Sequence, residues 1–147
     1  MSGVERFLRE YWFARRSIGR LMLDLSSAKA ALEHCYEQLP GARLEETGIR
    51  AAAASSPVEH AALVIVSQHR AEVASIEQRL AEERAMMARI EAALKEAVLS
   101  ERECEYVRLR YFENRSAEAV CQRMFCSPAT GGRIRETIIK KLAPLAG

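Results

Sequence analysis

An unbroken three-and-four spacing of apolar side chains runs through the first 39 residues of the chain and restricts them to a helical fold. The positions are Val4, Phe7, Tyr11, Ala14, Ile18, Leu21, Leu25, Ala28, Leu32, Cys35 and Leu39. This spacing places all of these side chains on one stripe of an α-helix, as in the seam of a coiled coil. We therefore predict a helix over residues 3–38, ended by Pro40 and Gly41.

A second seam of the same kind follows after a connector. Its positions are Ala62, Val66, His69, Val73, Ile76, Leu80, Glu83, Met87, Ile90, Leu94 and Ala97. We predict a helix over 58–98, about 60 Å long, which must lie against another long helix. That partner is either the first helix, in an antiparallel hairpin, or a second copy in a dimer. Residues 40–57 show no sustained period and are predicted to be a linker.

Three shorter helices are predicted in the last third of the chain, over 100–111, 117–124 and 128–142. The first starts at an S-x-x-E capping box, and the third starts at a Ser-Pro pair, which suits the first turn of a helix. Helices of these lengths, joined by short turns, are typical of a helix-turn-helix module. We therefore expect an all-α fold: a long helical hairpin or coiled-coil stem over 1–98, followed by a three-helix module over 100–147.

The third of these helices has one apolar and one polar side. The apolar side consists of Ile134, Ile138, Ile139 and Leu142. The polar side consists of Thr130, Arg133, Arg135, Glu136, Thr137, Lys140 and Lys141. The net charge of the chain is only +2, but residues 100–147 hold nine Lys and Arg against six Asp and Glu. The polar side is therefore the predicted surface for phosphate and base contacts.

The same region resembles known transcription proteins. The stretch ECEYVRLRYFENRSAEAVCQRMFCSPATGGRIRETIIKKL is similar to region four of sigma factors, and more similar still to phage and prophage late-gene transcription regulators of the RinA and ArpU kind. The family pattern reads L-R-Y, a turn, S-x-x-x-[IV]-[AC], S-x-x-T, R-I and K-K-L. This chain has it at Leu109-Arg110-Tyr111, Ser116, Val120-Cys121, Ser127, Thr130, Arg133-Ile134 and Lys140-Lys141-Leu142.

The resemblance implies a role for individual residues. Thr130 and Arg133 would be the main DNA-facing residues, and Ser127, Arg135 and Lys140 would hold phosphates. It further implies a sequence-specific regulator of phage origin that binds double-stranded DNA and contacts RNA polymerase. With its coiled coil, we expect such a regulator to form a homodimer.

One departure from the family pattern concerns two glycines. Where the family has an apolar residue after the threonine, this chain has Gly131 and Gly132. Two glycines inside a helix cost about 2 kcal/mol relative to alanine. Either the first turn of the helix orders only on DNA, or groove reading has been lost. The second case favours a protein-binding adaptor that docks on RNA polymerase or another regulator, and a further alternative is a small DNA-packaging recognition subunit.

Other classes of function find no support in the residues. The cysteines, Cys35, Cys104, Cys121 and Cys126, show neither a CxxC pair nor the spacing of a disulfide framework or a zinc site. No nucleophile has a placed base, and no phosphate loop is present. We therefore expect a cytoplasmic protein that is not an enzyme, with no metal, no cofactor, no signal peptide and no membrane span.

Overall fold

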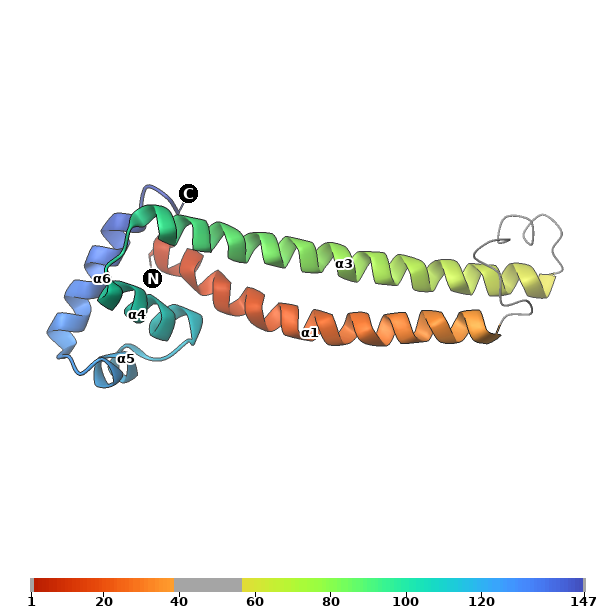
Figure 1. Cartoon of the computed structure of the whole chain (residues 1–147), viewed down its shortest axis with the longest axis horizontal. Coiled ribbons are helices and arrows are strands. Elements are labelled where there is room, and N and C mark those ends of the chain that lie inside the picture. Colours follow the sequence, from red (N-terminus) through yellow and green to blue (C-terminus); the bar gives the residue numbers. More distant parts are fainter. Residues whose placement is uncertain (1, 39–56, 147) are drawn as a thin grey trace. The chain divides into compact units, whose positions relative to one another are not determined.

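The fold is all-α, as predicted from the sequence. The structure is a computed structural model that describes residues 2–38 and 57–146. Its elements are α1 (Gly3–Gln38), α3 (Pro57–Ala97), α4 (Glu101–Val107), the π-helical turn η1 (Arg108–Phe112), α5 (Ala117–Arg123) and α6 (Pro128–Leu142) (Figure 1). No strand occurs within these two described ranges. Apart from its last residue, the predicted linker over 40–57 lies outside them.

Serine side chains start the three short helices, as the sequence predicts for the first and the third. The Oγ atoms of Ser100, Ser116 and Ser127 each accept a hydrogen bond from the backbone N–H three residues later, over 3.1 to 3.2 Å. Each bond satisfies one of the N–H groups that a helix leaves free at its first turn. The start of each short helix is therefore determined locally.

The helix predicted over 100–111 changes its hydrogen-bond pattern midway. After α4, the backbone widens into η1, in which the N–H of Glu113 donates to the carbonyl of Arg108 over 2.9 Å. Apolar periodicity does not distinguish this five-residue step from the ordinary four-residue one. The turn contains Leu109 and Tyr111, both fully buried, so its residues belong to the core.

The described chain divides into two compact units, and both long helices contribute to each. The first unit is Met1–Ile18 with Glu82–Gly147, and the second is Gly19–Ala81. In the first unit, α4, α5 and α6 gather around the N-terminal end of α1 and the C-terminal end of α3 (Figure 1). Its core consists of Val4, Phe7, Leu8, Ile90, Ala93, Tyr106, Val107, Leu109, Tyr111, Val120, Met124, Ile138 and Leu142.

Tyr11 joins three elements at the edge of this core. Its ring stacks on that of Phe112 in η1, with 3.8 Å between the ring centroids. Its hydroxyl donates a 2.9 Å hydrogen bond to Glu91 in α3. Such a stack adds about 1 kcal/mol beyond the burial of its apolar area. Tyr11 therefore helps to hold α1, α3 and η1 together.

In the second unit, the remaining parts of α1 and α3 lie side by side and run in opposite directions (Figure 1). Their buried apolar residues are Leu21, Ala28, Val66, Val73, Ile76 and Leu80, all of them positions of the two predicted seams. Arg70 donates a hydrogen bond to the hydroxyl of Tyr36 across the pair. Among the described helices, none combines the length and the apolar character needed to cross a membrane.

Candidate nucleic-acid interface

Helix α6 has the two sides that its sequence predicts. Ile138 and Leu142 are fully buried in the core of the first unit, and Ile134 and Ile139 are half-buried beside them. The exposed residues of the helix include Arg133, Glu136, Thr137 and Lys140. An amphipathic helix held by its apolar side in this way leaves the other side free for a partner.

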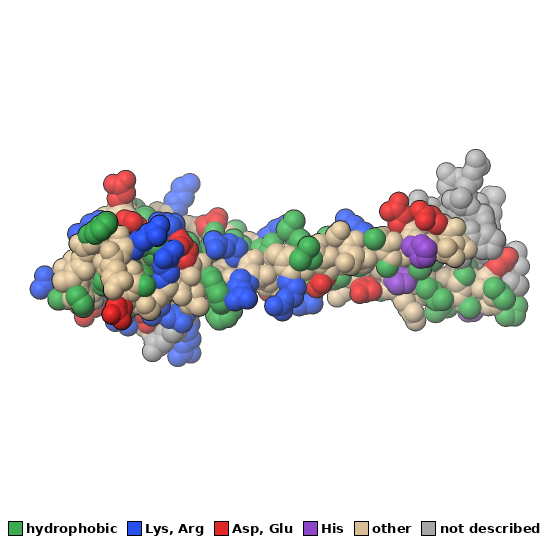
Figure 2. All heavy atoms as spheres, turned by 90° about the horizontal axis from the view of Figure 1, so that it is seen from below, with side chains coloured by type: hydrophobic (Ala, Val, Ile, Leu, Met, Phe, Trp, Pro, Cys, Tyr) green, Lys and Arg blue, Asp and Glu red, His purple; other side chains and the backbone are tan. Residues whose placement is uncertain are grey.

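Two of the five predicted DNA-binding residues are exposed cations. Arg133 and Lys140 are both open to solvent, and neither forms an ion pair with any residue in the described ranges. Their positive charges are therefore available to an anion. Figure 2 shows that Lys and Arg side chains are interspersed with Asp and Glu on the face that it draws.

Two further predicted residues, Ser127 and Thr130, form the N-terminal cap of α6. The backbone N–H of Thr130 donates to Oγ of Ser127 over 3.2 Å, and the two hydroxyl oxygens lie 3.0 Å apart in a second hydrogen bond. Ser127 is exposed and Thr130 is half-buried. The two residues are therefore close together, but much of their hydrogen-bonding capacity is used within the cap.

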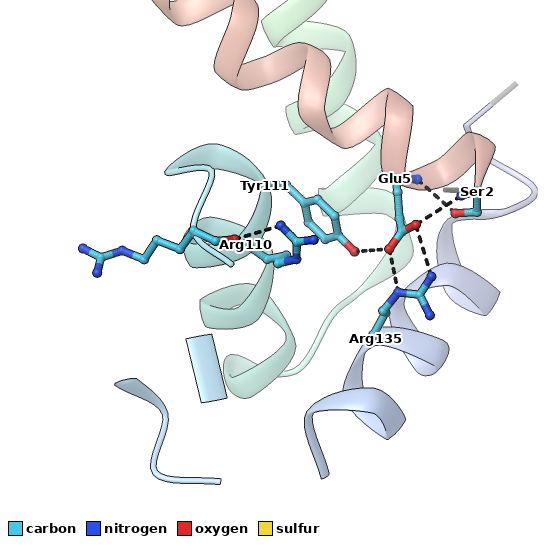
Figure 3. Close-up of polar contacts among 6 residues, drawn as sticks. Ser2, Glu5, Arg110, Tyr111 and Arg135 are labelled. Carbon is cyan, nitrogen blue, oxygen red and sulfur yellow. Dashed lines mark hydrogen bonds and ion pairs between the residues drawn. The ribbon is translucent and has the colours of Figure 1, made fainter. Parts of the chain in front are cut away.

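The fifth predicted residue, Arg135, is held by α1. Its Nε donates to Oε1 of Glu5 over 2.6 Å, and its Nη2 donates to Oε2 over 3.2 Å (Figure 3). The side chain of Glu5 is only 7% exposed and that of Arg135 is 41% exposed. The structure thus directs Arg135 towards the N-terminal helix, away from Arg133 and Lys140.

Glu5 also accepts hydrogen bonds from two other groups. The hydroxyl of Tyr111 donates to its Oε1 over 3.0 Å, and the backbone N–H of Ser2 donates to its Oε2 over 3.1 Å (Figure 3). The N–H of Glu5 donates in return to Oγ of Ser2, which completes a capping box at the start of α1. Our sequence reasoning missed this role of Glu5, although the S-x-x-E pattern at residues 2–5 would have indicated the cap.

The three side chains of this cluster hold one another in fixed protonation states. The hydrogen bond from Arg135 is the largest influence on Glu5, and it lowers the pKa of Glu5 from 4.5 to about 2 despite burial. Burial, followed by the charge of Glu5, raises the pKa of Tyr111. The hydrogen bond to Glu5 raises the pKa of Arg135. At neutral pH the cluster is therefore a carboxylate between a guanidinium and a protonated phenol.

A second ion pair holds the C-terminal end of α6. Nζ of Lys141 lies 2.7 Å from Oε1 and 3.0 Å from Oε2 of Glu103 in α4. Burial opposes ionisation of Glu103, but the hydrogen bonds from Lys141 and Ser100 keep its pKa below the usual value. The polar side of α6 is therefore divided: Arg135 and Lys141 bind within the first unit, and Arg133 and Lys140 face solvent.

The two glycines of α6 have different surroundings. The helix is continuous through both, and Gly131 is buried. A Cβ atom on Gly131 would lie 2.4 Å from Sγ of Cys121 in α5, whereas a Cβ atom on Gly132 would meet nothing within 4 Å. Gly131 therefore allows α5 and α6 to approach closely, which gives the departure from the family pattern a reason in packing.

Side chains that could ligate a metal ion are dispersed over the described helices. Within residues 2–38 and 57–146, no group of three His, Cys, Asp or Glu side chains is arranged to hold a metal ion. All four cysteines are free thiols. Burial and a neighbouring Cys126 raise the pKa of the Cys121 thiol. The candidate site is thus a surface of one helix and the turn before it.

Comparison of the chain with protein-family models, with curated proteins and with solved structures found no match.

Proposed function

We propose that the chain is a sequence-specific DNA-binding transcription regulator that places α6 in the major groove of duplex DNA. In this proposal α5 and α6 form the two helices of a helix-turn-helix, with α4 as their support and the paired long helices as a stem. The observation that carries it is the exposed side of α6, where Arg133 and Lys140 have no acidic partner among the described residues.

The chemistry of this surface suits a nucleic acid. Unpaired cations release the counterions of DNA phosphates when they bind, which supplies much of the affinity of such proteins. Residues near the N-terminal end of the helix can reach base edges, and Thr130 and Arg133 occupy that end. Because Arg135 is ion-paired with Glu5, we propose that it anchors α6 to α1. Arg133 and Lys140 are then the proposed cationic contacts to DNA.

The setting of this activity is proposed from the resemblance. The pattern shared with regulators of the RinA and ArpU kind suggests transcription control in a phage or prophage, with RNA polymerase as a second partner. We further propose that two copies associate through α1 and α3, so that two α6 helices meet two half-sites at a fixed spacing. Light scattering from the purified protein tests the dimer.

A selection experiment tests the proposed function directly. The full chain is incubated with a pool of duplexes of random sequence, bound duplexes are recovered and sequenced over several rounds, and the affinity for the enriched duplex is measured against salt. We expect one enriched motif and a steep fall in affinity with rising salt. No enrichment together with a flat salt dependence would rule the function out.

A protein-binding adaptor is the second candidate, and exposed apolar side chains favour it. In the second unit, Met22, Leu23, Val64 and Ile65 are between 43% and 72% exposed. Exposed apolar side chains of this size are available for contact with a partner protein. Co-purification with RNA polymerase, in a protein that shifts no duplex in a gel, would favour the adaptor over the regulator.

A further inference from the structure

The turn between α5 and α6 projects a large apolar side chain into solvent. Phe125 is 96% exposed, whereas its neighbours Met124 and Cys126 pack against the core of the first unit. Two hydrogen bonds hold the turn: the N–H of Phe125 donates to the carbonyl of Gln122, and that of Cys126 donates to the carbonyl of Cys121. The outward direction of Phe125 is thus built into the turn.

The backbone of Phe125 is also in an unfavourable conformation. Its φ angle is +54°, in the left-handed region that bulky side chains rarely occupy. A glycine or asparagine would fill this position at lower cost, as Asn114 does in the preceding turn with the same φ. Val98 also combines a left-handed φ with strong exposure, so what sets Phe125 apart is its aromatic ring and its place in the turn that leads into α6.

The surroundings of Phe125 identify the charge of that partner. Arg123 lies two residues before it, and Arg133 lies on the exposed side of α6. Neither arginine forms an ion pair within the described ranges, although Glu136 also lies on this side of the helix. Along the sequence Phe125 thus lies between two exposed arginines, and an apolar side chain combined with unpaired cations is complementary to a polyanion with apolar groups in its grooves, as duplex DNA is.

We infer that Phe125 contacts base edges in the major groove and selects thymine through its C5-methyl group. This inference rests on the proposed function and adds a specificity-determining residue to it. The geometry agrees, because Phe125 comes three residues before Pro128, the first residue of α6, and the N-terminal end of such a helix is the part that approaches the bases. Apolar side chains read thymine methyl groups in the same way in other complexes.

A tryptophan reporter tests the contact itself. The chain has a single tryptophan, Trp12, so the double variant Trp12→Phe, Phe125→Trp carries one reporter in the turn. The matched control is Trp12→Phe, Val98→Trp, because Val98 is another exposed turn residue of the first unit, with a φ of +51°. With a 20-base-pair duplex that carries the motif enriched by the wild-type chain (about two helical turns), we expect DNA to protect the tryptophan at 125 from acrylamide quenching and to leave the one at 98 unprotected.

A substitution in the DNA tests the base that is read. Duplexes enriched by the wild-type chain are resynthesised with deoxyuridine in place of every thymidine, which removes only the methyl groups. We expect wild-type affinity to fall by about fourfold for one methyl group in contact. Phe125→Ala should bind the two duplexes equally, and melting curves of the variant check that it is folded.

The outcomes separate this inference from the proposed function. Gel shifts that persist while the tryptophan at 125 stays as accessible as in free protein would overturn the inference and leave the function standing. An equal loss on deoxyuridine for wild type and Phe125→Ala would overturn thymine reading. Absence of binding to any duplex would overturn both.

Discussion

Glu5 and Arg135, which are 130 residues apart in the chain, form a two-pronged ion pair with bonds of 2.6 and 3.2 Å. The pair connects the first turn of α1 to the middle of α6. Because α6 carries the exposed cations, the pair fixes the rotation of the helix about its axis. Its loss is therefore expected to affect both the stability of the first unit and the direction in which Arg133 points.

The first prediction concerns the stability of this pair. Arg135→Met leaves the carboxylate of Glu5 buried without a cation, and should lower the free energy of unfolding by about 2 kcal/mol. The value is below that of a fully buried pair because the side chain of Arg135 is 41% exposed. Urea unfolding followed by circular dichroism measures the change.

Arg133→Met is the matched control for this experiment. It removes an exposed cation from the same helix and should change the free energy of unfolding by less than about 0.5 kcal/mol. In the double variant Glu5→Gln, Arg135→Met, part of the loss should be recovered, because no buried charge remains. Equal effects of the two methionine variants would contradict the structural role of Arg135.

The second prediction concerns pH. Because the pKa of Glu5 is lowered from 4.5 to about 2 on folding, acid protonates the unfolded chain first. The stabilisation from Glu5 is complete above about pH 5 and is lost as the pH falls from there towards 2, and with the Arg135 side chain 41% exposed it amounts to about 2 kcal/mol. The measurement is the difference in unfolding free energy between wild type and Glu5→Gln at several pH values.

The difference in unfolding free energy between wild type and Glu5→Gln reports on Glu5 and not on the other carboxylates. Glu103 and Glu113 also have lowered pKa values, and both contribute to acid unfolding of the wild type and the variant alike. We expect the difference between the two proteins to shrink steadily from pH 5 to pH 2. A difference that stays constant over this range would mean that Glu5 is not ionised against Arg135.

The third prediction contrasts the two glycines of α6. Gly131→Ala forces a Cβ atom to within 2.4 Å of Sγ of Cys121 and should destabilise the chain by about 1 to 3 kcal/mol. Gly132→Ala meets open space and should stabilise it by up to about 1 kcal/mol, because alanine favours the helix. Thermal melting of both variants gives the signs.

Cys121→Ala provides the rescue for Gly131→Ala. Removing Sγ takes away the atom that the new Cβ would meet, so Cys121→Ala, Gly131→Ala should melt above Gly131→Ala alone. If the added alanine at 131 raised the melting temperature in the wild-type background, the close approach of α5 and α6 would be disproved.

The fourth prediction concerns the proposed DNA contact. Arg133→Ala should weaken binding to the enriched duplex by about 1 to 3 kcal/mol if the side chain reads a base. Lys140→Ala should weaken binding to all duplexes alike and reduce the salt slope by about one, as expected for a phosphate contact. Gel-shift titrations at fixed and at varied salt measure these effects.

Arg102→Ala is the control for these titrations, because Arg102 is an exposed cation of the first unit on α4 rather than on α6. It should leave the affinity near the wild-type value. If Arg133→Ala kept its full affinity for the enriched duplex, Arg133 would not be part of the DNA interface.

The bounds of the helices could be predicted from the sequence better than the way in which the helices pack together. Apolar periodicity placed α1, and periodicity together with the Ser127-Pro128 start placed α6, at the bounds that the structure has, because both signals are local. The π-helical turn was missed, since the pattern of apolar residues is the same for a four- and a five-residue step. The grouping of Met1–Ile18 with Glu82–Gly147 was not visible either, because it depends on contacts between distant residues.

In the candidate site, too, local features could be predicted from the sequence and long-range contacts could not. Sequence reasoning assigned Arg133, Arg135 and Lys140 to one polar side of α6, whereas in the structure Arg133 and Lys140 are exposed and Arg135 is half-buried against α1. It could not show that Glu5 from the other end of the chain takes Arg135, since an ion pair over this separation leaves no local pattern. Likewise, the sequence shows Gly131 only as a residue that weakens a helix. The close approach of Cys121, which explains a glycine there, depends on the packing of α5 against α6.

The composition of the core of the first unit has a consequence for synthesis of the chain. Val4, Phe7 and Leu8 leave the ribosome before the residues that share their core, among them Ile138 and Leu142, are made. Until then these three side chains have no native cover, which exposes the nascent chain to aggregation and to chaperones. A fragment that starts at residue 100 would expose the same core from the other side, because its helices would lack the apolar side chains of α1 that pack against them.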